Sequence, residues 1–257
     1  MNSDIKQLTS VNNEKVKYFY SLLDKKTRTK EQLFIVEGYH LVDEASKTSN
    51  LKAVLSVDEK LLNKYKVSEK YLINNAILEK LSSTKNPQPI IGIVKMLDSN
   101  VDSLQYILNK NEVRLVILDD VNDPGNLGTI IRTTAALGYD ALIMSNATVD
   151  LYNDKVIRST QGVMFKIPLF KMDLPFAIKL LKEKGVYCMG TSLKNAVDLE
   201  DAKRCAKLAL CFGNEARGMS DEILNLMDKN IKIKMHNDVE SLNVSVASSI
   251  VMWEMKK

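Results

Sequence analysis

The first hundred residues alternate short apolar runs with segments whose apolar residues recur at helical spacing. Residues 13–25 carry the first helical pattern, and the polar stretch 27–32 after them is expected to be a loop. Strands are then predicted at 32–38, 53–57, 70–74 and 90–96, with helices at 39–47, 58–65 and 76–83. Strands that alternate with helices indicate an α/β layer domain.

A second series of the same kind begins at 114–120, where an unbroken apolar run predicts a strand buried on both faces. A helix at 129–138 and a strand at 141–145 follow, then strands at 186–192, 208–213 and 231–235 and a closing helix at 242–255. The polar stretch 97–103 separates the two series. We therefore divide the chain into an N-terminal domain (1–97), a linker (98–112) and a C-terminal domain (113–257).

Composition excludes several classes of protein. The chain has 257 residues, no apolar run long enough to span a membrane, and an N-terminus too polar for a signal peptide, so we expect a cytoplasmic protein. Its cysteines, Cys188, Cys205 and Cys211, match no metal-ligand spacing and are expected to be reduced thiols packed in strands. The two histidines lie far apart in sequence, so no metal site is predicted.

The net positive charge of the chain comes from its first half. Residues 1–110 hold 17 Lys and Arg against 13 Asp and Glu, whereas residues 111–257 hold 19 of each. Within this half, basic residues crowd the stretch 15–30. A basic cluster suits the polyphosphate backbone of RNA, although a solubilising surface explains it equally well. The candidate RNA-binding residues are Lys15, Lys25, Lys26, Arg28 and Lys30.

Three segments of the second half combine a strand, a turn and a helix with polar residues at the turn. Eight of the ten glycines lie between Gly125 and Gly218, where they allow close backbone approach to a ligand. In the first segment, 122–138, Asn126 is a candidate helix cap, and Arg132 stands in an otherwise apolar helix. An arginine there indicates either a structural ion pair or a functional group, and residue type alone favours the ion pair.

The second segment, 210–224, runs from a buried strand into Gly213, Asn214 and Glu215. Its glycine spacing resembles a P-loop, but Met219-Ser220 replaces the Lys-Ser/Thr pair, which excludes an NTPase. A simple turn with Ser220 as helix cap is the plainer interpretation.

The third segment, 231–255, leads from a strand through a polar loop to Ser241, a candidate cap of the last helix. Ligands of α/β folds bind at the carboxyl ends of strands, so the three turns are expected to meet in one pocket.

The three segments resemble the signature motifs of the SpoU/TrmH family of RNA ribose 2′-O-methyltransferases, a branch of the SPOUT superfamily. Asn126-Leu127-Gly128 through Arg132 and Gly138 is similar to the first motif, Phe212-Gly213-Asn214-Glu215 through Gly218 to the second, and Ile233 through Ser241-Leu242-Asn243-Val244-Ser245-Val246-Ala247 to the third. Residues 30–96 resemble the substrate-binding domain often attached to such enzymes.

The resemblance implies a C-terminal α/β domain with a trefoil knot and a smaller N-terminal α/β domain like ribosomal protein L30e, which binds RNA. It also implies a homodimer that uses S-adenosylmethionine to methylate a ribose 2′-hydroxyl of 23S rRNA or of tRNA. The implied catalytic residues are Arg132, Glu215, Asn126 and Asn243. The implied cofactor-binding residues are Thr191, Gly213, Ile233, Met235, Ser241 and Leu242.

The family often has a proline where this chain has Lys234, a change that either weakens cofactor binding or adds a phosphate contact. For the reaction we expect Arg132 to hold the phosphate next to the acceptor ribose and to stabilise the negative charge that grows on the oxygen. Glu215 either orients Arg132 or receives the proton, and Asn126 and Asn243 fix side chains or substrate. The alternatives are a catalytically silent knotted RNA-binding protein and a base methyltransferase of the same superfamily.

Overall fold

The computed structural model describes residues 4–97, 99–236 and 241–256, so the part of the third motif at 237–240 lies outside the described residues. The chain forms two compact units: unit 1 comprises Met1–Asp98 with Tyr152–Phe165, and unit 2 comprises Ser99–Leu151 with Lys166–Lys257. The segment Tyr152–Phe165, which the sequence analysis assigns to the C-terminal domain, thus packs with the N-terminal one. Each unit is described by itself.

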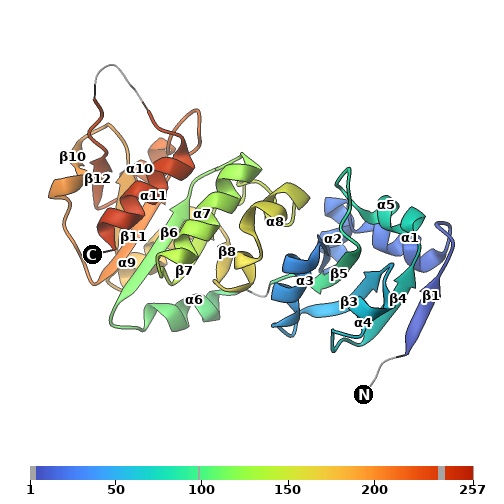
Figure 1. The fold of residues 1–257 in the computed structure, drawn as a ribbon. Helices are drawn as coiled ribbons and strands as arrows, with labels where there is room; N and C mark the ends of the chain where they lie inside the picture. The colour runs from blue at the N-terminus through green and yellow to red at the C-terminus, as the bar shows by residue number, and fades with distance from the viewer. Residues whose placement is uncertain (1–3, 98, 237–240, 257) are drawn as a thin grey trace. The chain divides into compact units, whose positions relative to one another are not determined.

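Unit 1 is built on a five-stranded sheet of order β1-β4-β3-β5-β2, in which β5 is antiparallel to both of its neighbours. Apolar side chains of α1 and α5, among them Phe19 and Ile77, pack into the core of this unit. Its elements are β1 (Ile5–Leu8), α1 (Glu14–Ser21), α2 (Lys25–Glu31), β2 (Leu33–Glu37), α3 (Tyr39–Ser46), β3 (Leu51–Ser56), α4 (Glu59–Leu62), β4 (Glu69–Ile73), α5 (Asn75–Leu81), β5 (Ile90–Lys95), α8 (Asp154–Thr160) and the 3₁₀ turn η1 (Val163–Phe165) (Figure 1).

The stretch 27–32, predicted as a loop, lies largely in helix α2. The side chain of Asp24 caps this helix by accepting a hydrogen bond from the N–H of Thr27. The guanidinium of Arg28 is buried and donates to the carbonyls of Leu22 and Leu23. The helix is therefore held by a cap and a buried charge, and it lacks the apolar periodicity that reveals helices in sequence.

Unit 2 contains a seven-stranded sheet of order β10-β12-β9-β11-β6-β7-β8, in which all the pairings are parallel. Helices α7 and α11 pack together against one face, and α6, α9 and α10 contribute to the core on the other (Figure 1). The strands are β6 (Val113–Leu118), β7 (Ala141–Met144), β8 (Leu169–Lys171), β9 (Tyr187–Thr191), β10 (Ala196–Asp198), β11 (Lys207–Phe212) and β12 (Lys229–Lys232). The helices are α6 (Val101–Leu108), α7 (Pro124–Ala136), α9 (Leu174–Glu183), the 3₁₀ turn η2 (Leu199–Asp201), α10 (Asp221–Leu226) and α11 (Val244–Met255).

Helix α6 occupies most of the stretch 98–112 that the sequence analysis treats as a linker. Its Leu104, Ile107 and Leu108 are buried in the core of unit 2. Asn100 caps the helix, and the side chain of Ser103 completes a reciprocal capping box. The polar residues that suggested a linker are the cap of this helix.

The helix caps around the motifs differ from the prediction in two places. Helix α7 begins at Pro124 with Asp123 as its cap, so Asn126 lies inside the helix instead of capping it. Helix α11 is capped by Asn243 instead of Ser241. Ser220 caps α10, as predicted. Both corrections leave the carboxamides of Asn126 and Asn243 in the same part of unit 2.

Candidate cofactor and active site

A cavity of about 710 Å³ opens in unit 2 at the carboxyl ends of β9, β11 and β12. The N-terminal turn of α11 closes one side of it. This is the edge at which parallel α/β sheets bind ligands. All six predicted cofactor residues line it: Thr191, Gly213, Ile233, Met235, Ser241 and Leu242.

Gly213 shapes the wall of this cavity. A Cβ atom at this position would lie 2.1 Å from the nitrogen of Met219 and 2.2 Å from the carbonyl carbon of Gly218, so a side chain does not fit. The loop closes on itself, because Asn214 and Gly218 exchange backbone hydrogen bonds of 3.0 and 2.9 Å. Gly218 has φ +70°, which favours glycine. The second motif therefore builds a tight loop of main chain beside the cavity.

A chain of hydrogen bonds joins the three motifs. The carboxylate of Glu215 accepts from the N–H groups of Asn122 and Asp123, at 3.2 and 3.0 Å, and from the carboxamide of Asn126 at 3.0 Å. The side-chain oxygen of Asn126 accepts in turn from Nδ2 of Asn243 at 2.9 Å. The three segments thus contact one another, and Glu215, Asn126 and Asn243 form one connected unit, but among the described residues the cavity is lined by the second and third segments and not by the first.

This arrangement changes the role of Glu215. Partial burial acts to raise the pKa of its carboxyl, but the hydrogen bonds from Asn126 and from backbone N–H groups outweigh it and hold the pKa below its usual value. A carboxylate that accepts three hydrogen bonds is a poor proton acceptor. It makes no hydrogen bond or ion pair with Arg132 among the residues that the structure describes. In this geometry Glu215 holds Asn126 and the turn before α7 in place, and its part in the reaction stays a prediction.

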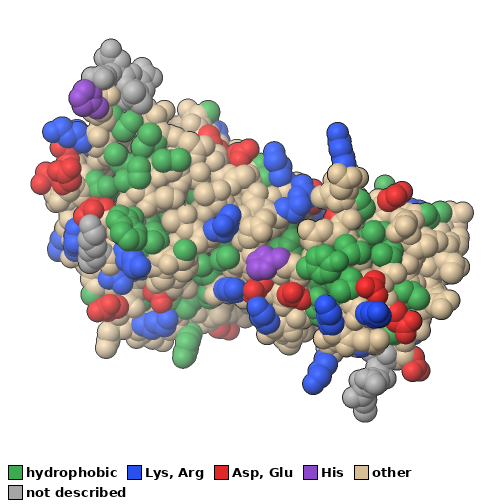
Figure 2. Space-filling view, viewed as in Figure 1, with side chains coloured by type: hydrophobic (Ala, Val, Ile, Leu, Met, Phe, Trp, Pro, Cys, Tyr) green, Lys and Arg blue, Asp and Glu red, His purple; other side chains and the backbone are tan. Residues whose placement is uncertain are grey.

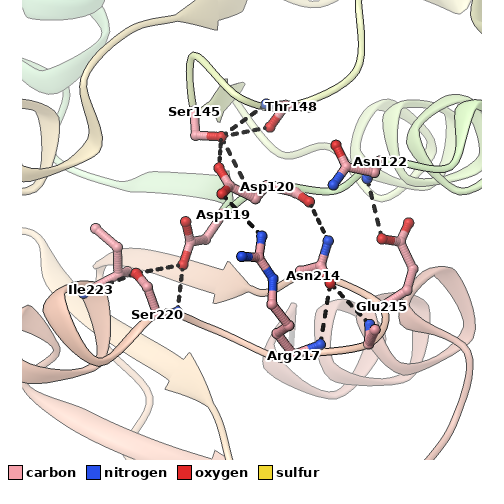
Figure 3. A network of polar contacts seen from close by, with 11 residues as sticks. Asp119, Asp120, Asn122, Ser145, Thr148, Asn214, Glu215, Arg217, Ser220 and Ile223 are labelled. Carbon is pink, nitrogen blue, oxygen red and sulfur yellow. Dashed lines mark hydrogen bonds and ion pairs between the residues drawn. The ribbon is translucent and has the colours of Figure 1, made fainter.

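The ends of β6 and β11 are tied together through Asp119 and Asp120, which the sequence did not single out as site residues (Figure 3). Asp119 accepts from the N–H and the hydroxyl of Ser220, at 2.8 and 3.0 Å, which anchors the start of α10. The carboxamide of Asn214 donates to the carbonyl of Asp120 at 2.8 Å. Asp120 has φ +59°, an uncommon conformation for a non-glycine residue. Two acidic residues in succession at the end of a buried strand were the available signal.

Asp120 is further fixed by contacts on both sides. Ser145 donates to its carboxylate at 2.7 Å and accepts from its N–H at 3.0 Å. The guanidinium of Arg217, a residue that lines the cavity, points toward Asp120 and lies 3.5 Å from its Oδ2 (Figure 3). The turn after β6 is thereby attached to both the β7 end and the loop of the second motif.

Arg132 stands apart from this cluster. It is exposed on α7, does not line the cavity, and makes no hydrogen bond or ion pair with any residue in the described part of the chain. The ion pair that residue type alone favoured is therefore absent among the described residues. The neighbouring Thr133 lies 3.2 Å from Ser249 of α11, hydroxyl to hydroxyl, so this part of α7 adjoins α11.

The predicted RNA-binding cluster of unit 1 separates into different environments. Arg28 is buried and bound to carbonyls, which overturns its assignment as a phosphate contact. Lys15 pairs with Glu69 at 3.1 Å and lies over the ring of Phe19. Lys25, Lys26 and Lys30 are exposed. The exposed lysines remain available to a phosphate backbone.

The described residues contain no group of three or more His, Cys, Asp or Glu that could hold a metal ion. No helix among them is long and apolar enough to cross a membrane. The thiols of Cys188 and Cys211 are buried in strands, whereas Cys205 is only partly buried and lies outside any strand, and all three are free.

The fold and the cavity together define an α/β enzyme domain with a cofactor site at the carboxyl edge of a parallel sheet. Residues 114–253 match the model of the SpoU rRNA Methylase family, and residues 13–92 match the MRM3-like substrate binding domain. The chain belongs to the SpoU rRNA methylase family, and the family predicted from the motifs is confirmed.

Individual relatives extend over the whole chain. The chain is 34% identical to the 23S rRNA (guanosine(2553)-2′-O)-methyltransferase RlmP of Bacillus subtilis, over 98% of this chain and 100% of that protein. An AdoMet-bound rRNA methyltransferase from Sinorhizobium meliloti superposes with a TM-score of 0.88 at 28% identity, over 98% of this chain and 97% of the other. AviRb of Streptomyces viridochromogenes shares the fold, with a TM-score of 0.85 at 24% identity over 95% and 97% of the two chains. The predicted α/β fold is confirmed, and the knot and the likeness to L30e stay predictions.

Proposed function

We propose that this protein transfers a methyl group from S-adenosylmethionine to a ribose 2′-hydroxyl of 23S rRNA. The observation that carries the proposal is a cavity lined by the second and third motifs, to which Asn126 of the first motif is joined through hydrogen bonds with Glu215 and Asn243. The RlmP relative, which matches over its full length, supports 23S rRNA as the substrate ahead of tRNA.

The cavity fits S-adenosylmethionine in its chemistry. Apolar side chains of Ile233, Met235 and Leu242 line it, and the main-chain loop at Gly213 forms a wall that leaves no room for a side chain. Main-chain groups near these residues and Thr191 would hold the cofactor, which supplies an electrophilic methyl group when bound. A wall of main chain and apolar side chains suits a ligand that combines a polar amino acid, a flat base and carbon groups around a positively charged sulfonium.

The acceptor side is assigned to Arg132 with the support of the hydrogen-bonded cluster. A ribose hydroxyl is a weak nucleophile, and negative charge grows on its oxygen as the proton leaves. The exposed guanidinium of Arg132 grips the adjacent phosphate and stabilises that charge. Glu215 holds Asn126, and Asn126 holds Asn243 at the start of α11, so this set fixes the geometry of the site without taking the proton.

A homodimer accounts for the exposed surface of α11. Val246, Ile250 and Trp253 recur at helical spacing and are 47%, 40% and 57% exposed, which is a large apolar face for a helix. Hydrophobic side chains gather over the part of the surface where α11 runs (Figure 2). Arg132 lies on the adjoining α7, so pairing of this face brings Arg132 next to a second subunit. We place the enzyme in the cytoplasm, where ribosomal RNA is modified.

The proposal is tested by methyl transfer to ribosomal RNA from cells that lack the protein. Purified protein, S-adenosylmethionine with a labelled methyl group and this RNA are combined, and labelled nucleosides are separated after nuclease digestion. Label on ribose supports the proposal, whereas label on a base indicates a base methyltransferase. RNA that is bound without acquiring label indicates the silent RNA-binding protein. Ribosomal RNA from cells that contain the protein is the matched control, because its target hydroxyl is already methylated.

A further inference from the structure

A second cavity, of about 190 Å³, lies within unit 1. The turn from β2 into α3, the loop between α5 and β5, and the C-terminal end of α8 form its walls. It is too small for a whole nucleotide cofactor and large enough for a single flat heterocycle.

The walls of this cavity are preformed. Glu37 accepts hydrogen bonds from the hydroxyls of Ser82 and Thr84, at 2.7 and 2.6 Å. Oε1 of Gln88 accepts from the N–H of Tyr39 at 2.9 Å. Gly38 has φ +99°, and a Cβ atom there would lie 2.7 Å from that same Oε1. The absence of a side chain at Gly38 therefore lets Gln88 pack against the backbone and keeps the cavity open.

The two charged side chains on the cavity wall, Arg158 and Glu37, already have partners. Arg158 donates to the carboxylate of Asp154 at 2.6 Å and to the hydroxyl of Ser83 at 2.6 Å. Glu37 is occupied by its two hydroxyl donors. Since Asp154 neutralises Arg158, Glu37 leaves the cavity with a net negative charge that repels a phosphate, so a ligand without negative charge fits it better.

Several lining side chains keep unused hydrogen-bonding atoms. His40 Nε2 lies 2.9 Å from the carbonyl of Gln161. A carbonyl only accepts, so Nε2 donates to it, and Nδ1 is left for a ligand. Among the described residues, Asn86, Nε2 of Gln88 and Oε1 of Gln161 have no hydrogen-bond partner. The cavity thus offers both donors and acceptors to a ligand.

We propose that this cavity holds one unpaired nucleobase of the RNA substrate and contributes to the choice of RNA. A nucleobase is flat, neutral and edged with both donors and acceptors, and carboxamides are well suited to read such edges. Proteins recognise RNA sequence mainly through bases that are free of pairing and stacking. The inference rests on the proposed function in one respect, that the substrate is RNA.

The test uses a pool of RNA hairpins with a short randomised loop, from which tagged protein captures bound molecules for sequencing. The unaltered protein is expected to enrich one base at one loop position. Asn86→Ala removes an exposed carboxamide that has no partner in the described structure, so the fold is preserved; binding falls about tenfold and the base preference disappears. Asn86→Asp keeps an acceptor in place of the donor and shifts the preference to another base.

Lys85→Ala is the matched control, because Lys85 is exposed in the same loop and does not line the cavity. It should weaken binding to all loop sequences alike and leave the base preference intact. Absence of any preference in the unaltered protein, or an unchanged preference in Asn86→Ala, overturns the inference. Methyl transfer to ribosomal RNA is measured in parallel. Transfer without a base preference refutes the cavity alone, and preference without transfer refutes the proposed reaction alone.

Discussion

Two charged residues of unit 2 that the sequence analysis assigns to catalysis stand in opposite surroundings. Glu215 lies in the region where the motif loops meet and accepts three hydrogen bonds from Asn122, Asp123 and Asn126. Arg132 lies on the exposed side of α7 and has no partner among the described residues. A group with its bonding capacity filled maintains geometry, whereas a guanidinium with five unused donors is ready for a ligand.

The same contrast recurs in unit 1. Arg28 is buried with its guanidinium bound to carbonyls at 3.2 and 2.6 Å, whereas Lys25 and Lys26 on the same helix are exposed. Because Lys25, Lys26 and Arg28 are close in sequence, all three were predicted to bind RNA. Hydrogen bonding and burial, which only the structure reveals, separate Arg28, which holds the fold, from the exposed lysines that are free to meet a ligand.

The largest effect is expected from Arg132, which has no partner among the described residues. Arg132→Ala should lower the rate of methyl transfer by about 10²–10³-fold, because the charge that develops on the ribose oxygen loses its stabilising partner. Cofactor affinity, measured by calorimetric titration with S-adenosylmethionine, should stay nearly unchanged, since Arg132 does not line the cavity.

Arg132→Lys is the matched variant for this prediction. It keeps the charge but loses the planar fork, so it should recover part of the rate. Equal losses of rate and of cofactor affinity in Arg132→Ala would contradict the acceptor-site role.

A smaller effect is expected from Glu215, whose carboxylate already accepts three hydrogen bonds. Glu215→Gln should lower the rate by about 10–100-fold, since one carboxamide oxygen and an NH₂ group cannot accept the same three hydrogen bonds and a misplaced site loses rate steeply. The free energy of unfolding should fall by about 1 kcal/mol, at the low end for a charged acceptor because the side chain is partly exposed. If the rate of the unaltered protein falls as Glu215 becomes protonated in acid, and Glu215→Gln is slow at every pH, Glu215 acts as a base instead.

The difference in the free energy of unfolding between the unaltered protein and Glu215→Gln should depend on pH. The pKa of Glu215 in the folded state lies below its ordinary value of 4.5. Its carboxylate therefore contributes stability above about pH 4.5, and this contribution is lost as the pH falls through the lowered pKa. Chemical unfolding at several pH values should show Glu215→Gln less stable at neutral pH, with the difference disappearing in acid. A constant difference would show that the charge of Glu215 is unimportant.

The face of α11 that carries Val246, Ile250 and Trp253 resembles Arg132 in one respect, because its side chains are exposed and their apolar surface is not buried by the described residues. Trp253→Asp should weaken self-association by about 30-fold or more, as expected for a large aromatic residue at the centre of an interface. Light scattering over a range of protein concentrations measures this effect. Tyr106→Asp, at an exposed aromatic on α6, is the control. If Trp253→Asp leaves the mass unchanged, α11 is not the dimer face.

The sequence was sufficient to predict most of the strands, because these follow from buried apolar runs, but it missed the short strands β1, β8 and β10. Thr191, Gly213 and Leu242 lie where the resemblance implied. It was not sufficient for the helix α2, which has charged residues where an amphipathic helix has apolar ones. The segment Tyr152–Phe165 packs in unit 1 through contacts distant in sequence, such as Phe34 with Tyr152, which no local pattern encodes.

Within the site, residue types were identified and their roles were not. Glu215 follows a buried strand and a glycine, as many catalytic carboxylates do, yet its role depends on the backbone N–H groups of Asn122 and Asp123, far away in sequence. The caps at Asp123 and Asn243 were misplaced because several cap-forming residues stand in succession at each turn. Tertiary contacts chose among them.

The smallest effect is expected within helix α2, where the buried Arg28 is compared with the exposed Lys25 and Lys26. Exchanging Lys25 and Lys26 together for alanine should weaken RNA binding several-fold and flatten its salt dependence, since each phosphate contact contributes about 0.7–0.9 to the slope of log affinity against log salt. Arg28→Ala should leave that slope unchanged and lower the free energy of unfolding by about 1–3 kcal/mol, because two buried carbonyls lose their donor. Filter binding over a range of salt and chemical unfolding measure the two quantities in each protein. If Arg28→Ala flattens the slope as much as the double lysine change does, bonding state does not distinguish ligand contacts from structural groups in this protein, and the contrast between Arg132 and Glu215 loses its support.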